Sequence, residues 1–175
     1  MSKKTNLYVG KAGQFAAMSE FLMRGWNVAV PEVDIGDDIF VVRDSNGEFV
    51  RVQVKTATAQ TRTKSFSAQF SLPLAQLNRN FVPQLIYCFL VRHKEQWLPP
   101  LLMTRSDLRE KYRVEGLGTP TDDKLLLYFS FQNGQISCSN VDLTPFSNNF
   151  DLFPDIQHLK KAPLSILRKN TEQGL

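Results

Sequence analysis

The stretch "DIGDDIFVVRDSNGEFVRVQVKT", residues 34–56, contains two alternating apolar runs on either side of the turn-forming "DSNG" at 44–47. Asparagine and glycine tolerate the backbone conformations of tight turns, so the stretch predicts a β-hairpin. Its strands are expected at about 39–42 and 48–57. The hairpin brings polar side chains from both of its strands to one end, and this convergence directs the rest of the interpretation.

In the second strand, valine alternates with the polar residues Arg51, Gln53 and Lys55. Alternate side chains of a strand point to opposite faces, so the polar residues are expected to share one face. A four-residue loop, "DSNG", sets Asp38 opposite Gln53. A two-residue loop at 46–47, which the backbone freedom of Asn-Gly favours, sets Asp38 opposite Lys55. In both registers Asp38 lies on the face of Gln53 and Lys55, because both loops contain an even number of residues.

A carboxylate, a carboxamide and an ammonium group are therefore expected together at the open end of the hairpin. Oxygen ligands of this kind suit a hard cation such as Mg²⁺, and a lysine beside it can assist proton transfer or stabilise charge on a phosphate. The alternative is a cross-strand ion pair between Asp38 and Lys55 on a solvated face. Geometry alone leaves both interpretations open.

The other patterns predict an α/β protein with a mixed central sheet flanked by helices. The run "QLIYCFLV" is continuously apolar and predicts a central, buried strand. The two prolines of "QWLPPLLM" predict a broken strand near an edge. The expected helices are 11–24, 72–79 and 106–113, the last with Ser106 as its N-cap, and the further expected strands are 26–31, 66–72, 84–91, 96–103, 124–131 and 135–141.

The bulk properties fit one soluble domain over residues 1–175. The net charge of +4 is compatible with nucleic acid as a partner but does not require it. Cys88 and Cys138 lie in apolar runs and are expected to be buried free thiols. No run is long enough to span a bilayer, and the first ten residues lack the apolar core of a secretory signal. We therefore expect a cytoplasmic protein.

Four motifs together resemble the PD-(D/E)xK nuclease superfamily, and the similarity is greatest to its small resolvase-like and uncharacterised endonuclease-like members. The resemblance covers roughly residues 8–92 and implies a restriction-endonuclease-like core at about 8–113, with a C-terminal hairpin and tail at 124–175 as an elaboration. The motifs that carry it are "GKAGQ" at 10–14, "GWNVAVP" at 25–31, "DIGDD" at 34–38 and "VQVKTA" at 52–57.

The resemblance implies a metal-dependent DNA endonuclease that uses Mg²⁺ or Mn²⁺. Asp38 would be the metal-binding aspartate, with Gln53 and the backbone carbonyl of Val54 as further ligands. Lys55 would be the catalytic lysine. Gln14 occupies the helix position at which many relatives carry glutamate.

Two departures weaken this assignment, because Gln14 and Gln53 are neutral where acids are common in the family. A carboxylate from another position, Asp34, Asp37 or Glu20, could take the place of the missing acidic ligand. Asp34 as a brace of its loop and Glu20 as a solvated helix residue are the simpler interpretations. The alternative function is a nuclease-fold protein with weakened catalysis that acts as a nucleic-acid-binding or partner-binding module.

The polar segment "TATAQTRTKSFS", residues 56–67, follows the lysine and is rich in hydroxyl groups suited to phosphate contacts. A solvated polar loop is the competing interpretation. Cleavage of both strands of a duplex implies a homodimer or a higher homo-oligomer. The candidate DNA-contact residues are Lys11, Arg51, Thr56, Arg62 and Lys64.

Overall fold

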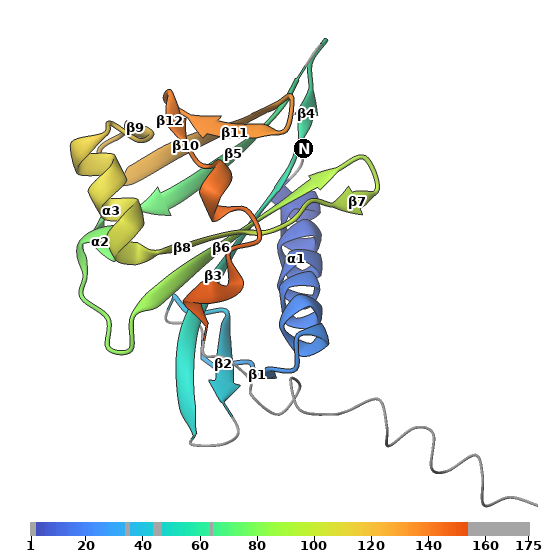
Figure 1. Cartoon of the computed structure of the whole chain (residues 1–175), viewed down its shortest axis with the longest axis vertical. Helices are drawn as coiled ribbons and strands as arrows, with labels where there is room; N and C mark the ends of the chain where they lie inside the picture. The colour runs from blue at the N-terminus through green and yellow to red at the C-terminus, as the bar shows by residue number, and fades with distance from the viewer. Residues whose placement is uncertain (1–2, 34–35, 44–46, 64, 154–175) are drawn as a thin grey trace, which may run out of the picture.

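The computed structural model describes residues 3–33, 36–43, 47–63 and 65–153, which form two β-sheets with helices packed around them (Figure 1). The first sheet is mixed and has the order β1-β2-β3-β6-β7, with β8 paired to β6. Its strands are β1 (Asn27–Ala29), β2 (Ile39–Arg43), β3 (Glu48–Thr58), β6 (Leu85–His93), β7 (Gln96–Trp97) and β8 (Leu101–Thr104). The α/β class with a mixed central sheet is therefore confirmed.

The predicted hairpin is present as β2 and β3, and its register is that of the four-residue loop. Arg43 pairs with Glu48, and the antiparallel ladder continues to Ile39 opposite Val52. The two-residue loop is therefore wrong, because the last strand pair already encloses the whole "DSNG" segment. On its other edge β3 pairs in parallel with β6, so Val52 lies opposite Ile86 in the middle of the sheet.

Helix α1 (Lys3–Met23) covers the valine face of this hairpin (Figure 1). Its buried residues Ala17 and Phe21 pack in one cluster with Ile39 and Val52 of the hairpin. The helix begins before the predicted start at residue 11, since it continues through Gly10. Glycine is a poor helix former, but packing against a sheet overrides a weak local preference.

The second sheet is antiparallel and has the order β12-β11-β10-β5-β4, with β9 paired to β10. In Figure 1 its strands lie beside the first sheet, on the side away from α1. Phe70 of β5 and Phe129 of β10 meet Phe89 of β6 in a core between the two sheets. The strands are β4 (Gln60–Thr61), β5 (Phe66–Pro73), β9 (Thr119–Pro120), β10 (Lys124–Gln132), β11 (Gln135–Cys138) and β12 (Val141–Asp142).

Two short helices, α2 (Leu74–Asn78) and α3 (Arg105–Val114), close the end of this core. Buried Arg105 joins them by donating to the carbonyl of Leu77 at 2.9 Å. The N-cap of α3 is Thr104, whose side chain accepts from the backbone N–H of Asp107, and the prediction of Ser106 is wrong. Thr104 has the extended backbone of an N-cap, whereas Ser106 already lies inside the helix.

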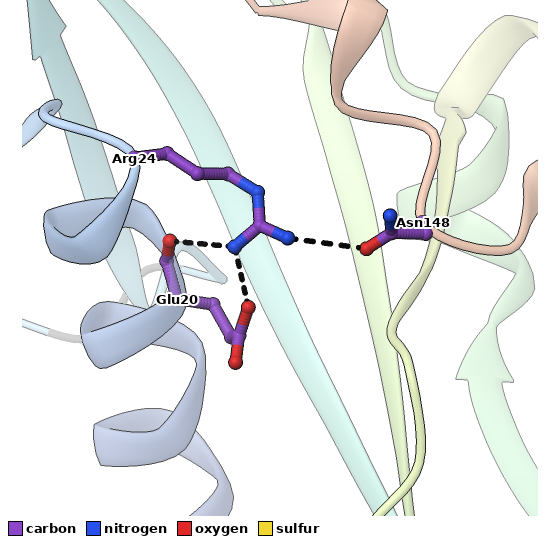
Figure 2. Close-up of polar contacts among 3 residues, drawn as sticks. All are labelled: Glu20, Arg24 and Asn148. Carbon is purple, nitrogen blue, oxygen red and sulfur yellow. Dashed lines mark hydrogen bonds and ion pairs between the residues drawn. The ribbon is translucent and has the colours of Figure 1, made fainter.

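The segment that follows the second sheet returns to α1 through the short helices η1 (Thr144–Phe146) and η2 (Phe150–Leu152). Arg24 at the end of α1 bonds to Glu20 and to Asn148, as Figure 2 shows, and its guanidinium lies 3.7 Å from the centre of the Phe150 ring. Phe153 packs in turn on Phe21. The chain thus folds back onto the helix that covers the hairpin.

The proline-broken strand is present as β7 and β8, and both cysteines are buried free thiols. The predicted tail beyond 153 lies outside the described residues. None of the helices described is long and apolar enough to cross a membrane.

Candidate functional site

Asp38 directly precedes the first residue of β2, and hydrogen bonds to β3 and α1 fix it beside the middle of β3. Its backbone N–H donates to the carbonyl of Val52 at 3.0 Å, and its carboxylate Oδ2 accepts from the backbone N–H of Val54 at 2.7 Å. The side chain of Gln14 donates to the Asp38 carbonyl at 2.6 Å. The carboxylate therefore replaces the missing partner strand at the edge of β3, between the positions of Gln53 and Lys55.

Gln53 is buried on the face of β3 that points away from α1, with 8% of its surface exposed. Among the described residues its side-chain oxygen Oε1 has no hydrogen-bond partner, and the same holds for Oδ1 of Asp37. Buried acceptors without a protein partner are uncommon, and a water molecule or a cation can satisfy them. Two oxygen atoms of the type that hard cations prefer therefore lie unpaired next to the Asp38 segment.

The loop before Asp38 is held in place from helix α2. Gly36 has a backbone φ of +102°, which favours glycine, and a Cβ atom there would lie 2.8 Å from Nε2 of Gln76. That nitrogen donates to the Gly36 carbonyl at 3.1 Å, while Tyr87 donates to Oε1 of the same amide at 3.3 Å. Gly36 and Gln76 also line a pocket of about 340 Å³ that contains Gln53.

Lys55 is half-buried on β3, two residues beyond Gln53 and on the same face of the strand. Thr56 points to the opposite face, under α1, where a Cβ atom on Gly13 would lie only 1.8 Å from Cγ2 of Thr56. The motif "GKAGQ" therefore has a packing role, because the glycine allows the helix backbone to approach β3 directly beside Lys55.

Gln14 uses both ends of its amide. Besides its bond to Asp38, its Oε1 accepts from the ammonium group of Lys11 at 2.7 Å. In this arrangement the helix residue braces the aspartate backbone and brings a cation to the rim of the site. The predicted residues Gln14, Asp38 and Val54 are thus joined by direct bonds, and Gln53 and Lys55 flank Val54 in sequence.

The predicted DNA-contact residues fall in different places. Arg51 forms an internal ion pair with Asp37, with Nη2 at 2.5 Å from Oδ2, and its guanidinium lies over the Phe81 ring. Lys11 and Arg62 are exposed at the surface. Lys64 lies outside the described residues, and a role of these residues in binding DNA stays a prediction.

The carboxylates considered as replacements also differ. Asp37 is buried and paired with Arg51, while its second oxygen has no partner among the described residues. Glu20 is half-buried and pairs with Arg24 at the end of α1. Asp34 lies outside the described residues.

Charge and burial at the site also act on the residues beneath it. Burial, together with the carboxylates of Glu20 and Asp38, raises the pKa of the Cys88 thiol to about 12. Cys88 lies opposite Val54 on the neighbouring strand β6. Burial also raises the pKa of Tyr87, so its hydroxyl remains a proton donor to Gln76.

The donors present fit a hard divalent cation in part. Asp38 supplies one carboxylate, Gln53 an amide oxygen and Val54 a backbone carbonyl, which together make a weak oxygen set that water or a phosphate would have to complete. Among the described residues no group of three acidic, histidine or cysteine side chains gathers to form a metal site.

Comparison with known proteins places the fold. No protein-family model matches the sequence, and no curated protein sequence matches it. The structure is similar to that of a bacterial homing endonuclease, I-Ssp6803I, with a TM-score of 0.50 and 17% sequence identity. The match covers 98% of this chain and 100% of the endonuclease chain. The chain therefore has a nuclease-like α/β fold.

Sequence patterns missed the residues that surround the site from the second half of the fold. Gln76 of α2 and Tyr87 of β6 hold the loop, but neither belongs to a motif, and only their tertiary contacts identify them. A cleft between β3 and the second sheet was also unexpected. It is lined by Thr56, Arg62, Gln69 and Tyr128, among others.

Proposed function

We propose that the protein is a metal-dependent DNA endonuclease of the PD-(D/E)xK type, a single nuclease domain that acts with Mg²⁺ or Mn²⁺. The observation that carries the proposal is the Asp38 carboxylate fixed on the Val54 backbone, next to the buried and unpaired Oε1 of Gln53. Lys55 follows directly on the same strand. The similarity of the fold to a homing endonuclease supports the same function.

Each residue would have a defined part in phosphodiester hydrolysis. A divalent cation bound by Asp38, Gln53 and the Val54 carbonyl would offset the negative charge that develops on the phosphate. Lys55 would orient the attacking water and stabilise the same charge. Gln14 and Lys11 would hold the Asp38 backbone in position and attract the DNA strand from the rim. Cleavage of both strands would require two copies of the chain.

A nicking assay on supercoiled plasmid with Mg²⁺ or Mn²⁺ tests the proposal. Lys55→Met and Asp38→Asn are expected to abolish nicking. Lys111→Met on α3 should leave it unchanged, because this lysine contacts Glu115 and the Phe146 ring and no residue of the proposed site. Equal activity in all four proteins would refute the assignment.

Metal binding can be tested without activity. A carboxylate adds a charged ligand where an amide is a weak one, so Gln53→Glu is expected to tighten Mn²⁺ binding measured by calorimetry. Gln96→Glu on the exposed strand β7 is the matched control. Unchanged Mn²⁺ affinity in Gln53→Glu would remove Gln53 from the ligand set.

The second candidate function is a nuclease-fold module that binds nucleic acid or a partner without cutting. The contacts of Gln14 favour it, because that helix position supplies no acid and its amide is already engaged. Salt-sensitive DNA binding by the wild type without any nicking would identify this function.

A further inference from the structure

The outward face of the second sheet is largely polar. Along β5 and β10 the residues that point inward, such as Phe70 and Leu127, are buried, and the alternate residues point to solvent. Strand pairing sets Gln69 opposite Tyr128 and Ser67 opposite Ser130. We define the outer face as the polar, uncharged part of this surface, namely Gln60, Ser67, Gln69, Ser71, Tyr128, Ser130 and Ser137. Leu126 and Lys124 of β10 point the same way at the end of the strand nearest α2.

Every member of the outer face is uncharged and carries a side chain that can both donate and accept hydrogen bonds. Gln69 is exposed, and half of the Tyr128 surface is exposed. Side chains with this chemistry recognise base edges, since glutamine pairs bidentately with adenine and serine pairs with several bases.

The spacing of the outer face also fits a duplex. The major groove is about 12 Å wide and admits a two-stranded β-ribbon. Side chains two residues apart on one strand are separated by about 6.8 Å, which corresponds to about two base-pair steps of about 3.4 Å. Gln69 and Tyr128 are directly opposed on β5 and β10, so their side chains lie about 5 Å apart and would reach neighbouring base pairs.

The outer face continues into a cleft of about 540 Å³ between β3 and the second sheet. Its walls include Thr56 and Thr58 of β3 on one side and Gln69 and Tyr128 on the other. Among the described residues that line the cleft, Arg62 carries a charge, which is positive. Thr56 directly follows Lys55 in β3 and points to the other face of the strand, so a DNA strand in this cleft would run beside the segment of β3 that carries the proposed active centre.

The opposite edge of the sheet is electrostatically different. Asp142 of β12 lies opposite Ser137. Hydrogen bonds from the side chain and the backbone N–H of Thr144 lower the pKa of Asp142. Lys111 offsets part of the Asp142 charge at that edge, whereas Arg62 makes the cleft favourable for a phosphate strand.

We propose that the outer face reads the sequence of duplex DNA in the major groove, with Gln69 and Tyr128 in contact with base edges and Arg62 with a phosphate. This inference rests on the nuclease function proposed above and adds how that nuclease would select its substrate. A helix is not required for such recognition, because β-ribbons also read the major groove.

The test is a selection from duplexes with a randomised 20-base-pair centre, carried out with Ca²⁺ in place of Mg²⁺ so that binding is read without cleavage. The wild type is expected to enrich a preferred sequence. Gln69→Ala and Tyr128→Phe should each lower the preference at one or two positions by about 5- to 150-fold. Gln96→Ala on β7 is the matched control and should enrich the wild-type sequence.

Affinity for one fixed duplex, titrated at several salt concentrations, separates the two kinds of contact. Arg62→Ala should weaken binding to all sequences and lower the slope of log K against log salt by about one. Gln69→Ala should leave that slope unchanged. A wild type that enriches no sequence, or a preference that survives both outer-face substitutions, would overturn the proposal.

Failure of the proposed sequence reading can be distinguished from failure of the nuclease assignment. If plasmid nicking depends on Lys55 but Gln69 and Tyr128 have no role in sequence selection, the nuclease assignment stands and the proposed role of the outer face is rejected. If the protein binds no duplex, or binds only single strands, the proposal that the outer face reads duplex DNA is rejected directly.

Discussion

The substitution Gly13→Ala tests whether the close approach of α1 to β3 builds the site. A Cβ atom at residue 13 would lie 1.8 Å from Cγ2 of Thr56 and 3.1 Å from its Cβ. Rotation of the threonine side chain cannot relieve the second contact, so the helix or the strand must move. Gly10 is the matched control, because a Cβ atom there would lie 3.9 Å from Oγ1 of Thr56, an ordinary contact.

The magnitude follows from two opposing effects. Overpacking of a tight contact costs about 1–3 kcal/mol, and the severe overlap at Gly13 favours the upper end. Replacement of glycine by alanine inside a helix returns about 1 kcal/mol. Gly13→Ala should therefore lower the free energy of unfolding by about 2 kcal/mol, and the melting temperature by about 4–8 °C. Gly10→Ala should raise the free energy of unfolding by about 1 kcal/mol.

Urea unfolding followed by circular dichroism gives both values. The double variant Gly13→Ala/Thr56→Ala removes the clashing methyl group, so it should be more stable than the sum of the two single effects by about 1 kcal/mol. Plasmid nicking by Gly13→Ala should fall at temperatures where the variant is still folded, because the displaced segment adjoins Lys55. Equal stability of the Gly10→Ala and Gly13→Ala proteins would refute this account of the helix–sheet contact.

Two further predictions concern buried charge and pH. Arg51→Met leaves the buried carboxylate of Asp37 without its cation, so it should lower the free energy of unfolding by about 3–5 kcal/mol in urea titrations, and the double variant Arg51→Met/Asp37→Asn should recover much of that loss. The raised pKa of Cys88 means that above about pH 9 the unfolded chain loses a proton that the folded chain retains, so the free energy of unfolding should fall as pH rises from about 9 to 12. Cys88→Ala should flatten this fall in unfolding curves measured across that range, and an unchanged slope would contradict the assignment.

Local patterns determined much of the first sheet. The alternation of valine with polar residues in 50–55 and the continuous apolar run at 84–91 correspond to β3 and β6, since strand periodicity depends on neighbouring residues alone. A loop with an even number of residues, the four-residue one, correctly predicted the register of the hairpin, in which Arg43 pairs with Glu48 and Ile39 with Val52. The choice between two loop lengths was wrong, because turn propensity in Asn-Gly is weaker than the pairing of whole strands.

The role of Gln14 shows the limit of motif reasoning. Its position on the helix was predicted from the spacing in "GKAGQ", but its bonds to Asp38 and Lys11 depend on the distance between α1 and β3. Arg51 likewise looked like a surface cation in sequence. Its pairing with Asp37 arises because the loop before β2 folds back over β3, which no local pattern encodes.

The sequence by itself determined the secondary structure and the register class that align Asp38, Gln53 and Lys55 along one hairpin, because those properties follow from the period of the strand. Only the tertiary structure decided that Gln53 is buried with an unpaired oxygen, that Gln76 holds the Gly36 loop, and that the second sheet forms a cleft beside β3. These features arise from contacts between segments far apart in the chain, and such contacts depend on how sheets and helices pack rather than on which residues are neighbours.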